Sequence, residues 1–212
     1  MTNKILLNSF IVAVFGAVAY FTSSSPIEIL SAISGLLCVW LAAKRNVWTY
    51  PVGLVNIVCY MYMFYNVQLY ADAGLQIVFF VLSLYGWFIW LTKREGQPVR
   101  PTRVMTTREW VLLLPVILAI TIIWGGSLHN FTNASIPYLD AFVASMSVVA
   151  QFFMGKKVLE NWLLWIAIDV LSIGMYMYKD LHIVALTYVF FLANAVYGYI
   201  AWKKEYEAEN GL

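Results

Sequence analysis

The chain has 212 residues, of which 62% are hydrophobic and 11% are charged, whereas a water-soluble domain carries roughly 25% charged residues. So few charged groups cannot cover the outside of a soluble globule, and the composition predicts a protein that is solvated by lipid. A net charge of +2 is too small for a nucleic-acid partner, and the two cysteines, Cys38 and Cys59, lie in apolar runs that form neither a disulfide framework nor a metal motif.

Eight stretches of mainly apolar residues follow along the chain, each long enough to cross a hydrocarbon core of about 30 Å as a helix. The alternating pattern of an outer-membrane barrel is absent, and the helix is the other fold that satisfies its own backbone in lipid. We therefore predict an all-α integral membrane protein with eight transmembrane helices. Their expected bounds are 5–21, 27–43, 47–65, 71–92, 109–124, 137–154, 158–178 and 182–202.

The first of these stretches has two interpretations. Lys4, the apolar run after it and the triplet Ala17-Val18-Ala19 also resemble a secretory signal peptide. Cleavage would leave seven helices, with the new N-terminus outside. We favour a retained helix, which makes residues 1–26 an extra N-terminal transmembrane segment.

Positive charge lies almost entirely on one side of this predicted bundle. Of the 13 Lys and Arg residues, only Lys179 falls in a loop on the other side. Because short cytoplasmic loops carry an excess of Lys and Arg, this distribution predicts that both termini are cytoplasmic. A miscounted helix would mix the two sides, so the separation also favours the count of eight.

Two parts of the chain resemble each other at a fixed offset. Asn56 corresponds to Asp169 at an offset of 113. The other pairs, offset by 112 or 113, are Lys44-Arg45 with Lys156-Lys157, Tyr65 with Tyr178, and Tyr85, Gly86 and Trp90 with Tyr197, Gly198 and Trp202. The pairs keep register across three helices, which predicts two parallel three-helix repeats.

Three helices reverse the direction of the chain, so a fourth must cross before a parallel second repeat can start. This predicts a first repeat at 27–92, a second at 137–204 and a tail at 205–212. The segment 93–136 between the repeats holds a cytoplasmic loop, a linker helix and an outer loop. Parallel repeats of this kind place a substrate site near mid-membrane at their interface, and the three-plus-one-plus-three plan is similar to that of the SWEET sugar transporters.

The predicted helix 158–178 has one face rich in polar and aromatic residues. Trp162, Trp165, Asp169, Ser172 and Tyr176 fall within an arc of roughly 80° at about 100° per residue. Asp169 lies about halfway along the span, where a carboxylate costs roughly 2.5 to 3.5 kcal/mol, so we expect it to face protein or water. It either attracts or orients a substrate or makes a structural hydrogen bond to a neighbouring helix.

The other helices add smaller polar stripes. The small residues along 137–154 either line a pathway or allow close helix contact. A cation over an aromatic face gains about 0.5 to 2 kcal/mol, so aromatic residues beside a carboxylate and amides suit a flat, positively charged ring that carries hydroxyls. The candidate binding residues on these helices are Asn56, Gln76, Ser147, Gln151, Thr187, Tyr188, Phe191 and Asn194.

The remaining tryptophans are interpreted as an aromatic belt at the lipid headgroups: Trp40, Trp48, Trp90, Trp110, Trp124 and Trp202. His129 and His182 are interpreted as outer interface residues, without a metal site. The phosphate-binding, zinc-protease, Gly-x-Ser-x-Gly and Cys-x-x-Cys motifs are absent. We therefore expect neither an enzyme nor a primary pump, and no cofactor. A duplicated unit around an aromatic pocket favours a carrier over a channel or a receptor.

Several motifs resemble those of the PnuC-type nicotinamide riboside transporters, over about residues 27 to 204. They are Trp-Thr-Tyr-Pro-Val-Gly from Trp48, Glu160-Asn161-Trp162 followed by Trp165 and Asp169, Tyr178-Lys179-Asp180-Leu181, and Tyr188 through Asn194 to Gly198 and Trp202. The resemblance implies uptake of nicotinamide riboside across a bacterial inner membrane by facilitated diffusion, with trapping by cytoplasmic phosphorylation. It also implies a homotrimer and no dedicated coupling ion.

On this hypothesis Trp162, Trp165 and Tyr188 contact the ring of the substrate, while Gln151, Asn194 and Asp169 bind its hydroxyls or carboxamide. Two alternatives stay open. Thiamine is also a flat cation with a hydroxyl-bearing arm, so a thiamine carrier of the same family fits the sequence. A membrane-embedded vitamin sensor that does not transport fits it as well, and coupling to protons through Asp169 is undecided.

Overall fold

A computed structural model describes residues 25–66, 70–92, 96, 99–132, 135–178, 180 and 182–211. Within these residues the chain is all-helical, and its β-pairing is limited to an isolated bridge between Arg103 and Val158. The seven helices are α2 (Pro26–Ala43), α3 (Thr49–Asn66), α4 (Tyr70–Trp90), α5 (Thr107–Phe131), α6 (Pro137–Gly155), α7 (Asn161–Tyr178) and α8 (His182–Asn210). The predicted helix at 5–21 lies outside the described residues.

Most predicted helix ends lie close to the observed ones, and the larger differences have local causes. α5 begins at Thr107 because Thr106 and Glu109 form a capping box, in which the Glu109 carboxylate accepts the Thr106 N–H at 2.9 Å. α8 continues to Asn210 because Lys, Glu and Ala after Trp202 are good helix formers. Residues 158–160 form a turn rather than the start of α7, because Val158 pairs with Arg103.

By length and composition, six of the described helices can cross a membrane: α2, α4, α5, α6, α7 and α8. This supports a multi-pass membrane protein. α3 forms as predicted and is 18 residues long, but Thr49, Pro51, Gly53 and Asn56 make it less apolar than the others. The predicted count of eight spans therefore stays a prediction.

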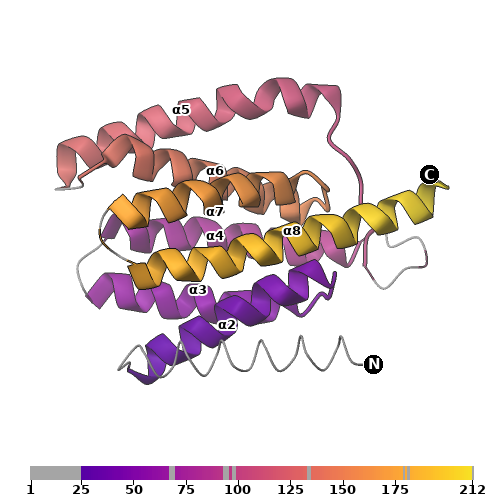
Figure 1. The fold of residues 1–212 in the computed structure, drawn as a ribbon, viewed down its shortest axis with the longest axis horizontal. Helices are drawn as coiled ribbons and strands as arrows, with labels where there is room; N and C mark the ends of the chain where they lie inside the picture. Colours follow the sequence, from indigo (N-terminus) through magenta and orange to yellow (C-terminus); the bar gives the residue numbers. More distant parts are fainter. Residues whose placement is uncertain are drawn as a thin grey trace.

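The seven described helices lie side by side, with α5 along one edge and α2 along the opposite edge (Figure 1). Successive helices pack together within 26–90 and within 137–210. Two further contacts join these halves, α4 with α6 and α2 with α8, while α5 packs against the outside of α6. Six helices therefore surround the centre of the molecule, and α5 stands outside them.

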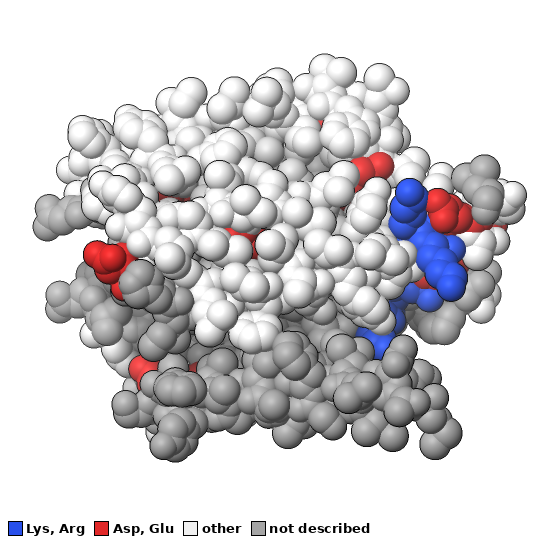
Figure 2. Space-filling model, in the orientation of Figure 1, with Lys and Arg blue, Asp and Glu red and all other residues white. Residues whose placement is uncertain are grey.

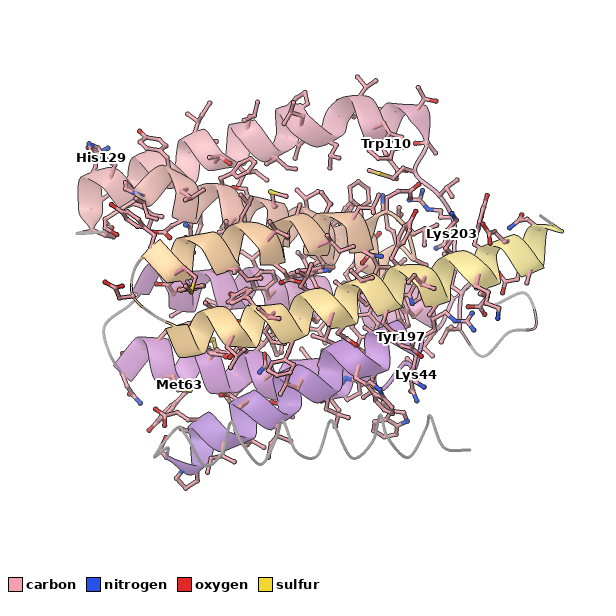
Figure 3. The ribbon with its side chains drawn as sticks, viewed as in Figure 1. Lys44, Met63, Trp110, His129, Tyr197 and Lys203 are labelled. Atoms are coloured by element: carbon pink, nitrogen blue, oxygen red, sulfur yellow. The ribbon has the colours of Figure 1, made fainter. Side chains whose placement is uncertain are left out.

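Lys and Arg gather at one end of the bundle in the face shown in Figure 2, and the middle of that face carries hardly any charge. Figure 3 places Lys44, Trp110 and Lys203 toward that end, and Met63 and His129 at the other. We call the first end the basic end. The positions of these labelled residues agree with the two sides assigned from the loop charges.

The two turns at the basic end have matching backbone geometry. α2 and α6 are followed by residues with a left-handed backbone, Arg45 with φ 54° and Lys157 with φ 59°. The N–H groups of these two residues donate to the carbonyls of Ala42 and Met154 at 2.9 and 3.0 Å. The same local fold therefore occurs 112 residues apart.

Candidate functional site

A cavity of about 320 Å³ lies among α2, α3, α4, α6, α7 and α8. This is within the range of small-molecule sites, about 300 to 1,000 Å³. Because every helix of the central six contributes to its walls, the cavity lies between the two halves of the chain. That is where parallel repeats were expected to hold a substrate.

Most of the predicted binding residues line this cavity. They are Asn56 on α3, Gln76 on α4, Ser147 and Gln151 on α6, Trp162, Trp165 and Asp169 on α7, and Tyr188 and Phe191 on α8. Thr187 and Asn194 are not among the lining residues; Ala195 lies there instead. The structure thus brings together side chains from five helices, and that they bind a substrate stays a prediction.

The α7 wall carries the strongest chemistry. Asp169 is 3% exposed and Trp162 is 0% exposed, and both lie along the cavity with Trp165 one turn from each. Asp169 is the only Asp or Glu among the described residues that line the cavity, and none of those residues is Lys or Arg. The cavity is therefore built for a ligand that is neutral or positively charged.

Several polar groups of the walls are already hydrogen-bonded within the protein. The Asn56 amide donates to the Ser31 carbonyl at 2.6 Å, joining α3 to α2. The Gln151 amide donates to the Ser83 hydroxyl at 3.2 Å, joining α6 to α4. These bonds fix the orientation of both amides, so that their remaining groups are held in place beside the cavity.

Other polar atoms of the walls have no partner within the described part of the chain. The indole N–H groups of Trp162 and Trp165 and the hydroxyl of Tyr50 are buried without a hydrogen bond. Buried polar atoms are nearly always paired in native proteins, and all three residues line the cavity. These groups are suited to bind the oxygens of a ligand.

A cluster of aromatic side chains lies at the end of the cavity away from the basic end. Tyr188 stacks on Tyr176 with ring centroids 5.2 Å apart, and Phe191 meets Tyr188 edge-on at 5.8 Å. Tyr60, which also lines the cavity, comes from α3 on the other side. A flat ring that enters here would meet aromatic faces before it reaches Asp169.

The lining includes residues that the sequence analysis did not select, among them Tyr50, Tyr60 and Cys38. Tyr60 lies one helical turn beyond Asn56, so the same helical spacing that was applied to α7 would have found it on α3. The two cysteines differ in exposure. Cys59 is 5% exposed, but Cys38 is half-buried and lies on the cavity wall.

Two glycines allow large rings to reach the basic end of the cavity. A Cβ at Gly198 would lie 2.6 Å from the Trp162 ring, and a Cβ at Gly86 would lie 2.5 Å from the Tyr50 hydroxyl. Real Cβ atoms do not approach other atoms this closely, so each glycine is needed for the observed packing. Gly86 and Gly198 are one of the pairs that define the predicted repeat.

The belt interpretation is wrong for Trp90 and Trp202, which are both 0% exposed. Trp90 meets Tyr50 edge-on with centroids 5.1 Å apart, and Trp202 meets Trp162 edge-on at 5.5 Å. Both residues lie toward the basic end of their helices, where belt residues are expected, but their rings face the protein. Their position along the helix was therefore predicted, and their direction was not.

Lys157 is also fully buried, in the turn after α6. Its ammonium lies 4.2 Å from the ring centroids of both Trp90 and Trp202, and it has no hydrogen-bond partner in the described residues. Burial lowers the pKa of Lys157, and Arg45 lowers it further. Each cation–π contact gains about 0.5 to 2 kcal/mol, whereas burying an ammonium costs several kcal/mol. The two indoles therefore offset only part of the cost.

Residues 25–204 match the family model described as "Nicotinamide mononucleotide transporter". The chain belongs to the nicotinamide mononucleotide transporter family. Members of this family are membrane transporters and not enzymes, as expected from the absence of catalytic motifs.

Named relatives and a solved structure agree with this membership. The chain is 26% identical over 203 residues to the nicotinamide riboside transporter PnuC of Escherichia coli K12, covering 84% of this chain and 85% of that protein. It is 29% identical over 204 residues to PnuC of Neisseria mucosa, covering 90% and 77%. It is also similar to the crystal structure of the vitamin B3 transporter PnuC, with a TM-score of 0.78, 25% identity and coverage of 98% and 93%.

Proposed function

We propose that this chain carries nicotinamide riboside across the cytoplasmic membrane by facilitated diffusion. The observation that carries the proposal is the cavity itself, which combines aromatic walls, unpaired indole donors and the carboxylate of Asp169. Nicotinamide riboside is a flat pyridinium cation with ribose hydroxyls and a carboxamide. The substrates named for the relatives support the same choice.

The charge of the cavity favours the riboside over the mononucleotide for which the family model is named. A phosphate monoester carries about −1.5 to −2 charges at pH 7 and would have to be paired when it is buried. The described lining residues include Asp169 but no Lys or Arg. A phosphate on the ribose would therefore lie unpaired beside a carboxylate.

The substrate-binding roles follow the positions of the walls. Trp162, Trp165 and Tyr188 contact the pyridinium ring, with Phe191 beside Tyr188. Gln151 and Asp169 bind ribose hydroxyls or the carboxamide, and Asn56, Gln76 and Ser147 complete the polar wall. Thr187 and Asn194, which lie outside the lining, remain candidates only for a state in which α8 has moved.

The movement that we propose is alternating access, in which the units 27–92 and 137–204 rock against each other about the cavity. The matching turns after α2 and α6 support the view that these units are repeats. So do the edge-on pairs Tyr50–Trp90 and Trp162–Trp202, which connect corresponding positions. In such a plan residues 93–136 form the linker and residues 205–212 a cytoplasmic tail.

The membrane arrangement is part of the proposal. The retained helix at 5–21 makes eight spans, and the basic end faces the cytoplasm of a bacterium, so that both termini are inside. The protein assembles as a homotrimer in the lipid bilayer. Cytoplasmic phosphorylation traps the product, which gives net uptake without a coupling ion.

Uptake into proteoliposomes tests the function. Wild-type protein should equilibrate labelled nicotinamide riboside across the bilayer, and a pH gradient should not drive accumulation. Binding without uptake would favour the vitamin sensor, and preference for thiamine would favour the alternative substrate.

The Asp169→Asn variant, which keeps the shape of the side chain, tests the role of charge. It should weaken binding of the cationic riboside about tenfold or more, equivalent to about 1.4 kcal/mol, and should weaken binding of its uncharged dihydro form less. Equal losses for both forms would show that Asp169 does not recognise charge.

A further inference from the structure

Four aromatic rings form a continuous layer between the cavity and the basic end. Tyr50 contacts Trp90, Trp90 contacts Trp202 with ring centroids 5.8 Å apart, and Trp202 contacts Trp162. Tyr50 and Trp162 line the cavity, whereas Trp90 and Trp202 do not. The three tryptophans are 0% exposed and Tyr50 is 3% exposed. The layer therefore closes the cavity at this end.

Two hydrogen bonds hold the layer together, and both join one half of the chain to the other. The indole N–H of Trp90, on α4, donates to the carbonyl of Met154, on α6, at 3.0 Å. The indole N–H of Trp202, on α8, donates to the carbonyl of Ala42, on α2, at 3.1 Å. These bonds lie in the two helix pairs that pack across the halves, α4 with α6 and α2 with α8. The halves cannot separate at the basic end while these bonds are intact.

The ammonium of Lys157 lies between the two indoles that make these bonds, 4.2 Å from each ring centroid. It is fully buried, and no described group accepts a hydrogen bond from it. Burial disfavours a charged group without a partner more than two aromatic faces favour it. Water would solvate the ammonium if the layer parted, so the charge favours the parted state.

We propose that Trp90, Trp202 and Lys157 form a gate at the basic end of the cavity, in which the two indole–carbonyl bonds hold the gate closed and the ammonium favours its opening. The gate's role in substrate release depends on the proposed transport function. The closure itself does not, because it is a property of the protein without substrate.

The native thiol of Cys38 reports on this gate, since Cys38 lies on the cavity wall. With Cys59→Ala as background, a membrane-impermeant cationic methanethiosulfonate is applied without substrate to vesicles of either orientation. The measured quantity is the rate of Cys38 modification from the basic end. Trp90→Phe and Trp202→Phe keep an aromatic ring but remove the N–H, so each should raise this rate about five- to tenfold.

Lys157→Met keeps a long apolar side chain and removes the charge, so it should lower the same rate about threefold or more. Trp110→Phe, on the outside of the bundle, is the matched control and should leave the rate unchanged. A general loosening of the fold would raise the rate in every core variant. The opposite signs for Lys157→Met and the two tryptophan variants therefore identify a gate.

Unchanged rates in both tryptophan variants, or a rate that rises in Lys157→Met, would overturn the proposal. Thermal unfolding of each purified variant shows whether it is folded. If one tryptophan variant does not fold, the other tryptophan variant and Lys157→Met still test the proposal. Because no substrate is added, the outcome is independent of which vitamin the cavity binds.

Discussion

Replacement of Gly198 by alanine should displace Trp162 and weaken substrate binding. A Cβ at this position would lie 2.6 Å from two atoms of the Trp162 ring and 2.7 Å from a third. Favourable contacts between carbon atoms have separations of about 3.5 to 4.0 Å, so the ring has to move by roughly 1 Å. Trp202, one turn further along α8, also contacts this ring, with ring centroids 5.5 Å apart.

Two opposing effects decide the stability of this variant. Alanine is favoured over glycine in a helix interior by about 1 kcal/mol. Overpacking of a core costs about 1 to 3 kcal/mol, and the Trp162 side chain is 0% exposed, so it has no free space to enter. We expect a net loss of stability of up to about 2 kcal/mol, together with a loss of binding affinity of about tenfold, equivalent to about 1.4 kcal/mol.

The matched control is Gly174→Ala on α7, where a Cβ would meet no other atom within 4 Å. This variant should gain stability from its helix propensity and should bind nicotinamide riboside as the wild type does. Thermal unfolding in detergent and fluorescence titration measure both quantities. If Gly198→Ala also gained stability and kept its affinity, the position of Trp162 against Gly198 would be wrong, and so would its role in the cavity.

Three further predictions concern the basic end. Gly86→Ala should act on Tyr50 as Gly198→Ala acts on Trp162, because its Cβ would lie 2.5 Å from the Tyr50 hydroxyl; an unchanged unfolding temperature and affinity would contradict this. Arg45→Gln removes the ion pair with Glu205, but both side chains are partly exposed, so calorimetry should show a loss of less than about 1 kcal/mol. Lowering the pH should speed Cys38 modification from the basic end by up to about tenfold per pH unit. Burial lowers the pKa of Lys157 in the closed gate, and opening to water returns this pKa to the usual value for lysine. At a pH between these two pKa values, opening of the gate therefore takes up a proton. The charged groups that act on Lys157 are Arg45 and Glu209, and Lys157→Met, measured at the same pH values to correct for thiol ionisation, should lose this dependence.

The sequence was most informative where helical spacing and burial agree. The α7 stripe of Trp162, Trp165 and Asp169 lies on one side of the cavity because residues three and four apart share a helix face. Spacing alone could not place Asn194, since the choice between its face and that of Ala195 depends on how α8 rotates against α2. Trp90 and Trp202 have the sequence position of belt residues, and only their packing against each other shows that they face inward.

The repeat pattern was also predicted from sequence, but the chemical difference between its two basic turns was not. Arg45 and Lys157 occupy matching turns with the same left-handed backbone, yet Arg45 pairs with Glu205 and Lys157 lies between two indoles. The difference arises because α8 continues beyond Trp202 to Glu205, whereas α4 ends at Trp90. Which helix continues depends on residues outside the repeat.

This asymmetry bears on how a transporter with two similar halves binds one substrate. The rings of the aromatic layer and the glycines beside it keep the same geometry in both halves, as expected if the layer opens by a movement shared between them. The walls differ: Asn56 uses its amide to bond the Ser31 carbonyl, while the corresponding position on α7 is the carboxylate of Asp169. If the cavity carries the cationic riboside as proposed, we expect the α7 side to hold its ring and the α3 side to close over it. On this view Asn56→Asp should give the cavity a second carboxylate and break the bond to α2. We expect this variant to slow transport more than it tightens substrate binding. Tighter binding with unimpaired uptake would show that the two walls are interchangeable.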